Sequence, residues 1–133
     1  MVLYRPPNNI SDFWDRLQDT IDLIQAASSN YRGIIFTGDF NIDVTDRSTT
    51  DAARLLSMME AVDLSQEVKS ITRQSTHDPT TGSTIDHLYT NRPDLFECVS
   101  VQSNPVTSDH HAIYFSLRSP KPFASKSVLR EFL

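Results

Sequence analysis

The chain of 133 residues is poor in cysteine and has no long apolar run. Its single cysteine, Cys98, excludes an intrachain disulfide, which suits a reducing compartment. No apolar run approaches the length of a membrane-spanning helix, and residues 1–7 do not have the pattern of a signal peptide. We therefore expect an intracellular protein with no membrane partner.

Basic residues are also scarce. The chain has 12 lysines and arginines against 17 acidic residues, a net charge of −5. A nucleic-acid-binding protein usually has a basic surface, so this balance argues against a stable complex with nucleic acid. An enzyme that gathers carboxylates around a metal ion can still act on phosphates, because the cation reverses the local field. Residues 118–133 differ from the rest, with a local charge of +3 against −8 for residues 1–117.

What is present is typical of a globular domain with one core, since 38% of the residues are apolar and 22% are charged. Hydrophobic periodicity predicts a mixed α/β fold. The expected helices are 10–27 and 50–62, the expected strands are 2–4, 33–37, 84–90, 96–102 and 111–118, and 65–83 is expected to be dominated by loops. Domain 1–118 is followed by the basic segment 119–133, which has the composition of a linker.

The first group of candidate site residues is Gly38-Asp39-Phe40-Asn41, directly after the buried strand. A strand that continues through Asn41 would place the Asp39 carboxylate and the Asn41 carboxamide on the same side. Such a pair can hold an attacking water and a phosphate oxygen together. A simple turn is the alternative, because glycine, aspartate and asparagine are common turn residues.

Two further groups combine aspartate with histidine. Asp86 lies inside a predicted strand, where a carboxylate needs a partner, and a histidine is a suitable one; an exposed strand position is the alternative. Asp109 and His110 precede the last strand, so one can bind a metal while the other faces a phosphate, unless they only begin the strand. We expect His111 to be structural and His77 to be solvated.

A fourth candidate, Tyr4, ends the first predicted strand and precedes Arg5-Pro6-Pro7. Its hydroxyl could donate a hydrogen bond to a phosphate. Alternatively, the Tyr4 side chain packs in the core and has no part in the chemistry.

In their order along the chain, these groups resemble the endonuclease/exonuclease/phosphatase superfamily. The Tyr4-Arg5-Pro6-Pro7 group, Thr72-Arg73 and Ser83-Thr84-Ile85-Asp86 are most similar to the endonuclease domain of non-LTR (LINE-type) retrotransposons. The resemblance implies hydrolysis of a DNA phosphodiester that leaves a 3′-hydroxyl and a 5′-phosphate. It also implies a nuclear location for the element's protein and, in a full-length element, a reverse transcriptase that follows the endonuclease.

The resemblance also implies a role for each candidate residue. Tyr4 would contact the phosphate, while Asp39 and Asn41 would position or activate the water or protonate the leaving oxygen. Asp86 would orient His110, which would stabilise the phosphate charge or act as a general base. Asp109 would belong to a divalent-metal site for Mg²⁺ or Mn²⁺, since these hard ions prefer carboxylate oxygens.

One departure from the family pattern concerns the other half of its fold. The family fold is a four-layer α/β sandwich (DNase I-like), whose N-terminal half supplies a glutamate that is the principal metal ligand. This chain matches the C-terminal portion, so we expect the N-terminal strands to be missing. The glutamates that are present lie in other sequence contexts: Glu60, Glu67, Glu97 and Glu131.

Three hypotheses follow. The first is a truncated nuclease-type phosphodiesterase that is weak or inactive as an isolated chain. The second is a remnant that binds nucleic acid or another partner without cutting. The third is another phosphoesterase of the same superfamily, such as a lipid or inositol phosphatase.

Overall fold

The structure is a computed structural model that describes residues 1–7, 12–78, 80–103 and 108–118. It is an α/β fold, as the sequence predicts. Its main elements, in chain order, are β1 (Val2–Tyr4), α1 (Phe13–Ala27), β2 (Ile35–Asp39), α2 (Thr50–Glu60), β3 (Ser65–Gln66), β4 (Arg73–Gln74), β5 (Gly82–Ser83), β6 (Asp86–Thr90), β7 (Phe96–Gln102) and β8 (Ala112–Leu117).

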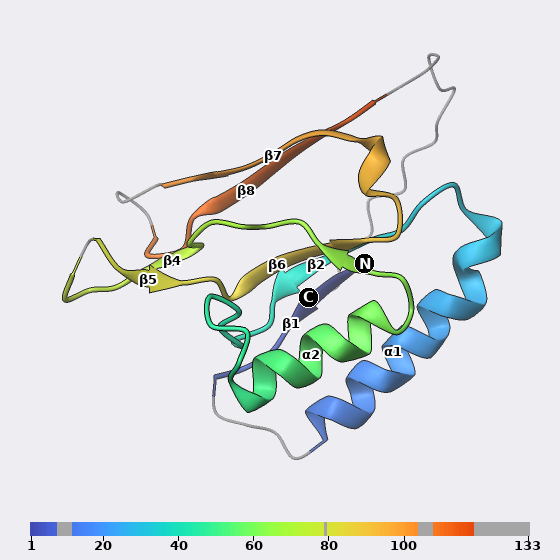
Figure 1. Cartoon of the computed structure of the whole chain (residues 1–133), viewed down its shortest axis with the longest axis horizontal. Coiled ribbons are helices and arrows are strands. Elements are labelled where there is room, and N and C mark those ends of the chain that lie inside the picture. Colours follow the sequence, from blue (N-terminus) through green and yellow to red (C-terminus); the bar gives the residue numbers. More distant parts are fainter. Residues whose placement is uncertain (8–11, 79, 104–107, 119–133) are drawn as a thin grey trace.

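A four-stranded sheet in the order β1-β2-β6-β3 forms the centre of the molecule. Strand β1 runs parallel to β2, whereas β6 is antiparallel to both β2 and β3. Helices α1 and α2 lie on one side of this sheet, and the two-stranded ribbon β7–β8 lies on the other (Figure 1). The short hairpin β4–β5 extends from one end of the sheet (Figure 1).

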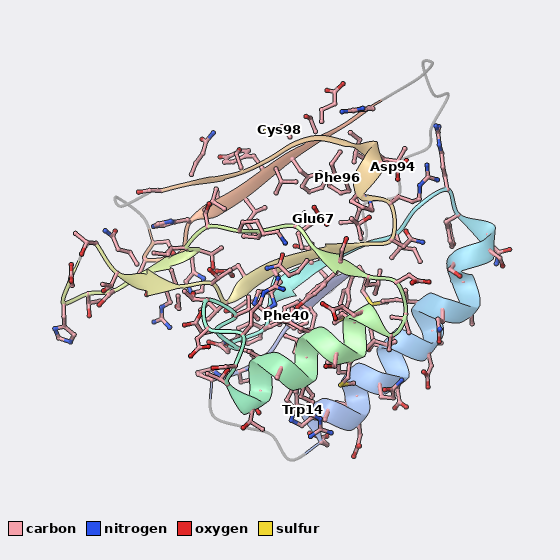
Figure 2. The ribbon with its side chains drawn as sticks, viewed as in Figure 1. Trp14, Phe40, Glu67, Asp94, Phe96 and Cys98 are labelled. Carbon is pink, nitrogen blue, oxygen red and sulfur yellow. The ribbon has the colours of Figure 1, made fainter. Side chains whose placement is uncertain are left out.

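The core lies between the sheet and the helices. Both helices are amphipathic, and each buries apolar side chains at helical spacing. The buried residues are Phe13, Leu17, Ile21 and Ile24 from α1, and Ala52, Leu55, Leu56 and Met59 from α2. Phe36 and Tyr89 meet them from the sheet, and Phe40, directly after β2, contacts both of these rings edge-on. Figure 2 shows Phe40 between the sheet and the helices.

Gly38 allows β1 and β2 to approach each other closely. It pairs with Leu3, and a β-carbon at Gly38 would lie 1.8 Å from the Leu3 carbonyl oxygen. Only a glycine fits there without moving a strand. The glycine of the Gly38-Asp39 group therefore has a packing function, and it keeps Tyr4 beside Asp39.

The ribbon β7–β8 is less well covered. Tyr114, Phe115 and Leu117 are 54%, 42% and 47% exposed, although Phe115 packs on Phe96 with ring centroids 5.5 Å apart. A mainly apolar groove of about 310 Å³ separates the ribbon from the ends of β2 and β6, and Ile35 and Leu117 line it. The ribbon thus exposes three large apolar side chains, whereas on helix α1 Leu23 is exposed.

The observed boundaries agree with the expected elements, with local differences. Strand β2 begins and ends two residues later than 33–37, β6 begins at Asp86 rather than at 84, and α2 ends at Glu60. The stretch 65–83 is mostly loop but includes the two-residue strands β3, β4 and β5. The predicted start of the first helix falls partly on residues 8–11, and the basic segment is 119–133; both lie outside the described residues. No described helix combines the length and the apolar character that crossing a membrane requires.

Candidate active site

Three of the candidate residues form one row across the sheet. Tyr4 pairs with Asp39 on the neighbouring strand, and Asp39 pairs with Asp86 on the next one. Side chains of paired residues in adjacent strands project from the same face of a sheet. Strand register therefore brings together residues that are up to 82 positions apart in the sequence.

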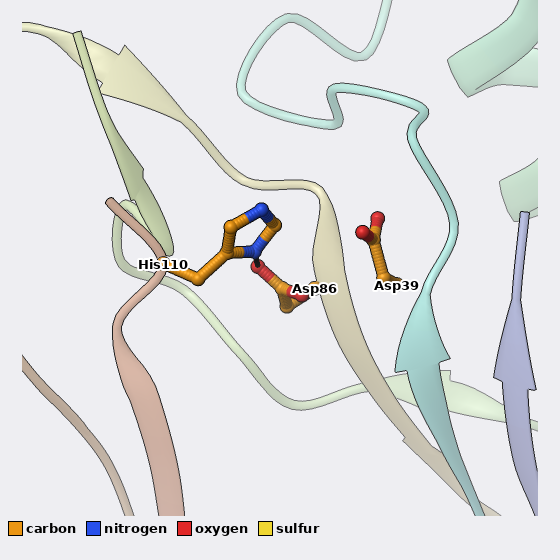
Figure 3. A group of neighbouring side chains, drawn as sticks. All are labelled: Asp39, Asp86 and His110. Atoms are coloured by element: carbon orange, nitrogen blue, oxygen red, sulfur yellow. Dashed lines mark hydrogen bonds and ion pairs between the residues drawn. The ribbon is translucent and has the colours of Figure 1, made fainter. Parts of the chain in front are cut away.

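His110 approaches this row from outside the sheet. Its ring Nδ1 lies 2.9 Å from Oδ2 of Asp86, and both side chains are partly buried (Figure 3). Asp39 is on the other side of Asp86, and the nearest ligand atoms of all three residues lie within 4.8 Å of one another (Figure 3). We call Asp39, Asp86 and His110 the acidic cluster. Asp86 thus has the histidine partner that its position in a strand predicted.

Thr72 fixes the relative positions of Asp86 and His110. Its side chain is buried, and the Oγ1 accepts hydrogen bonds from the backbone N–H groups of Ile85 (3.1 Å) and Asp86 (3.0 Å). Its carbonyl oxygen accepts a third bond, of 2.6 Å, from the N–H of His111. Because one residue joins the start of β6 to the segment that carries His110, the Asp86–His110 contact depends on Thr72.

Asn41 lies beside the cluster, but not as an extension of β2. The strand ends at Asp39, and Asn41 has a left-handed backbone (φ 47°). Of the two alternatives, the extended strand is therefore wrong and the turn is confirmed. The reason is local: Oδ1 of Asp39 accepts the Asn41 N–H at 2.9 Å, an Asx-type turn, and asparagine tolerates this backbone conformation.

Arg5 holds Asn41 in place. The Asn41 side-chain amide donates to the Arg5 carbonyl oxygen at 2.5 Å, and the Arg5 N–H donates to the carbonyl oxygen of Asp39 at 2.8 Å. The Arg5 guanidinium is mostly buried over the ring of Phe13, 4.5 Å from its centroid, and lies 3.8 Å from a carboxylate oxygen of Asp51. Arg5 thus connects the first helix to the turn that follows Asp39.

Burial raises the pKa of Asp39, and the nearby Asp86 carboxylate acts in the same direction. The Asn41 N–H opposes this shift, as do the charges of His110 and Arg73. A carboxylate with a raised pKa accepts a proton more readily than a free aspartate does. The environment therefore makes Asp39 more basic than a free aspartate, which is the direction that favours acceptance of a proton.

His87 belongs to the core rather than to the cluster. It is fully buried and stacks on Phe40 at 4.8 Å. Its Nε2 donates to the carbonyl oxygens of Ile42 (3.1 Å) and Thr84 (3.0 Å), so its Nδ1 accepts from the Tyr89 hydroxyl (3.1 Å). Burial lowers its pKa, which keeps this ring neutral. His87 and Asp86 are adjacent in the sequence but project from opposite faces of β6.

The other candidates occupy varied positions. Tyr4 is 68% exposed, which argues against the core-packing alternative. His77 is exposed, and Nδ1 of His111 lies 3.2 Å from the carbonyl oxygen of Ile71. Asp109 lies outside the acidic cluster: its Oδ2 accepts from Nε of Arg73 at 2.7 Å. Its assignment to a metal site stays a prediction.

Thr72 and Arg73 are the site residues that reasoning from the sequence did not assign a role. They were noted only as part of the similarity to the retrotransposon domains. A threonine and an arginine within a polar loop give no local signal of burial or pairing. Their partners are residues 83–86 and 109–111, which are distant in the sequence.

The acidic cluster has a donor set that fits a divalent cation. Asp39 and Asp86 offer carboxylate oxygens, which hard cations prefer, and His110 offers an imidazole nitrogen. Among the described residues no glutamate belongs to the cluster. The set therefore supplies fewer oxygens than a Mg²⁺ ion usually takes.

Comparison with known proteins assigns the fold. The sequence pattern of a family described as endonuclease-reverse transcriptase matches residues 1–114. Among curated proteins, no sequence matches the chain. The endonuclease domain of TRAS1, a telomere-specific non-LTR retrotransposon, superposes with a TM-score of 0.69 at 19% identity, covering 90% of this chain and 56% of that one.

Two bacterial structures are also similar. The 3′-5′ exonuclease NExo from Neisseria meningitidis has a TM-score of 0.68 at 14% identity and covers 87% of this chain and 59% of its own. A variant of the 3′ phosphatase NExo from Neisseria, bound to a product DNA hairpin, has a TM-score of 0.66 at 14% identity. The match covers 89% of this chain and 60% of that one. At these identities the likeness establishes the fold, and the chain spans 56–60% of the length of these proteins. Because the family pattern covers residues 1–114, the chain belongs to the endonuclease-reverse transcriptase family.

Proposed function

We propose that the chain is the C-terminal portion of a DNA endonuclease domain of a retrotransposon-like element, built on a four-layer DNase I-like sandwich, and that it hydrolyses phosphodiesters with a divalent cation. The observation that carries this proposal is the Asp86–His110 contact of 2.9 Å beside Asp39. A carboxylate hydrogen-bonded to Nδ1 fixes the orientation of the imidazole ring and leaves Nε2 available for a phosphate oxygen. Hydrolysis of a phosphodiester needs such an oriented ring.

In this proposal Asp39 takes a proton from the attacking water, because burial raises its pKa. His110, as an imidazolium whose Nδ1–H bonds to Asp86, donates its Nε2–H to the phosphate and stabilises the charge that develops there. Asn41 and Tyr4 contact the phosphate or the water from the neighbouring strands. One water is added and the P–O3′ bond breaks; the leaving oxygen takes a proton and becomes a 3′-hydroxyl, and the phosphate stays on the 5′ side.

Asp86 and Asp109 would supply carboxylate oxygens to the Mg²⁺ or Mn²⁺ ion, which leaves Asp39 for the proton transfer. When bound, the ion would polarise a phosphoryl oxygen. The metal-binding glutamate of the family is expected in the other half of the domain. The isolated chain therefore has a weak metal site, and activity is expected to be low.

Nicking of supercoiled plasmid DNA by the purified chain tests this proposal. We expect slow nicking with Mg²⁺, no nicking with EDTA, and a loss of at least about 100-fold in His110→Ala and in Asp39→Ala. His77→Ala is the matched control, because His77 is exposed and does not belong to the cluster. Nicking that survives in His110→Ala would contradict the assigned chemistry.

A second function, binding without cleavage, is favoured by one observation: Asp109 is paired with Arg73 and lies outside the acidic cluster. A folded chain that retards DNA in a salt-sensitive manner but does not nick it would support this alternative. Release of phosphate from lipid or inositol phosphates, without nicking, would instead favour another phosphoesterase of the superfamily.

A further inference from the structure

Arg73 and Asp109 form an ion pair at the edge of the acidic cluster. Nε of Arg73 lies 2.7 Å from Oδ2 of Asp109, and both side chains are nearly half exposed (46% and 42%). The pair is close to the cluster in two ways. Asp109 directly precedes His110 in the sequence, and the charge of Arg73 is among those that act on Asp39.

The backbone keeps these two side chains together. Arg73 forms a β-bridge with His110, and the N–H of Gln74 donates to the carbonyl oxygen of Asp109 at 3.1 Å. The N–H of His111 donates to Thr72 on the same side. Asp109 is therefore anchored next to Arg73 by its main chain, and only side-chain rotation can direct its carboxylate elsewhere.

The ion pair also borders an open space. Arg73 and Asp109 line a cavity of about 380 Å³ together with Ser75, Thr76 and other residues of the β4–β5 hairpin. The volume of this cavity exceeds that of a phosphate group. A guanidinium carries five N–H donors in a planar fork that suits phosphate oxygens, and the contact with Asp109 uses Nε.

We propose that Arg73 and a divalent cation compete for the Asp109 carboxylate, so that cation binding releases Arg73 to contact a phosphodiester beside the acidic cluster. The proposal rests on the proposed function, since it assumes that the site takes a cation and a phosphate. It goes further by assigning to Arg73 two successive partners. A half-exposed ion pair is weak, so a divalent cation can replace it.

Such an exchange couples the two ligands. The cation removes the carboxylate that neutralises Arg73, and the freed guanidinium then attracts phosphate. By linkage, a phosphodiester must raise the affinity for the cation by the same factor as the cation raises the affinity for the phosphodiester. Arg73 is thus a substrate-binding residue whose availability depends on the metal.

Mn²⁺ binding to the full chain, measured from the electron paramagnetic resonance of the free ion, tests the competition. We expect Arg73→Gln to bind Mn²⁺ between about threefold and tenfold more tightly than the unchanged chain, because a competing cation is gone. The matched control is Arg16→Gln. Arg16 on helix α1 and Asp12 directly before the helix form an ion pair through the same atoms at the same distance, Nε to Oδ2 at 2.7 Å, so the loss of this pair should leave Mn²⁺ affinity unchanged.

A second measurement follows Arg73 directly. In ¹⁵N NMR spectra, the Nε–Hε signal of Arg73 should shift on addition of Mg²⁺, and it should shift again when the dinucleotide TpT is added. TpT without Mg²⁺ should have a much smaller effect. The Nε–Hε signal of Arg16 should not respond to Mg²⁺ or to TpT.

Equal or weaker Mn²⁺ binding by folded Arg73→Gln, or no binding at all, would overturn the proposal. So would an Arg73 signal that does not change at saturating Mg²⁺. These results are independent of plasmid nicking. A chain that never nicks DNA can still exchange Arg73 for a cation, and a chain that nicks through His110 can fail every Arg73 test, so the two proposals are distinguishable.

Discussion

The two faces of the central sheet differ in how completely they are covered. On the helical face, Phe36, Phe40 and Tyr89 are fully buried against α1 and α2. On the other face, the ribbon β7–β8 stands over a groove and exposes about half of Tyr114, Phe115 and Leu117. The chain thus contains one complete core and one incomplete layer. We infer that its folding free energy comes mainly from the helical side.

The acidic cluster lies where these two parts meet. Asp39 and Asp86 come from strands of the well-packed sheet, and His110 comes from the segment that leads into β8. The two carboxylates are therefore positioned by the stable part of the molecule, and the histidine is attached through Thr72 and Arg73. The position of His110 relative to the two carboxylates therefore depends on these backbone contacts of Thr72 and Arg73.

The largest expected effect compares two phenylalanines. Phe36→Ala removes a fully buried ring and should destabilise the chain by about 3–5 kcal/mol, whereas Phe115→Ala, at a 42% exposed position, should cost below about 1 kcal/mol. Urea denaturation of both variants measures the difference. Equal losses would mean that the ribbon contributes to the core as much as the helical face does.

Thr72→Val should cost about 1–3 kcal/mol, because the N–H groups of Ile85 and Asp86 lose a buried acceptor. The side chains have the same shape, so packing is preserved. Thr76→Val, at an exposed position of the same segment, is the control and should change stability by less than about 0.5 kcal/mol. If Thr72→Val leaves the free energy of unfolding unchanged, the Thr72 hydroxyl does not stabilise the start of β6.

The third prediction concerns pH. Burial lowers the pKa of His87 in the folded chain, so below about pH 6.5 the unfolded state binds a proton that the folded state does not. The stability that this neutral ring confers is fully present above that pH. It should be lost as the pH falls, with a slope of at most about 1.4 kcal/mol per pH unit.

Denaturation curves between pH 5 and pH 8 measure this slope. His87→Gln should be less stable throughout and should lack the His87 contribution to the slope. His77→Gln is the control, because His77 is exposed and should leave the pH dependence unchanged. An identical slope in His87→Gln and in the unchanged chain would contradict the assignment.

The smallest effect concerns association. Exposed apolar residues on the ribbon favour weak self-association, which analytical ultracentrifugation detects as a sedimentation coefficient that rises with concentration. Phe115→Ser combined with Leu117→Ser should reduce this rise. Leu23→Ser, at a position 66% exposed on α1, should not. If Leu23→Ser reduces the concentration dependence more than the ribbon variant does, self-association occurs through the helical face. The comparison between the two faces is then wrong.

Much of this arrangement could be predicted from the sequence. Apolar periodicity predicted helices α1 and α2, and the run from Gly33 to Thr37 predicted a strand here, because these signals depend on neighbouring residues. The run was expected to be buried, but Phe36 alone is buried in it and the other four residues are half-buried. The boundaries were less accurate. Strands β3, β4 and β5 are each two residues long, and such short pairings depend on a partner strand rather than on their own composition.

The candidate site was predictable as a set of residues but not as a geometry. The partner that Asp86 needs is His110, 24 positions away, and not the adjacent His87, which the strand turns into the core. For Asn41 the sequence left an extended strand and a turn open, and the left-handed backbone of Asn41 makes the turn, which leads the chain toward Arg5. The pairing of Asp109 with Arg73 had no signal in the sequence at all.

The sequence by itself determined the α/β class, the amphipathic helices, the strand that precedes Asp39 and the residue types that chemistry at a phosphate requires. These properties arise from local periodicity and from the chemistry of single side chains. Only the tertiary structure decided which carboxylate meets which histidine, which histidine stays neutral in the core and which arginine neutralises Asp109. Those outcomes depend on strand register and on burial, which arise when distant segments pack together and bring side chains within hydrogen-bonding distance.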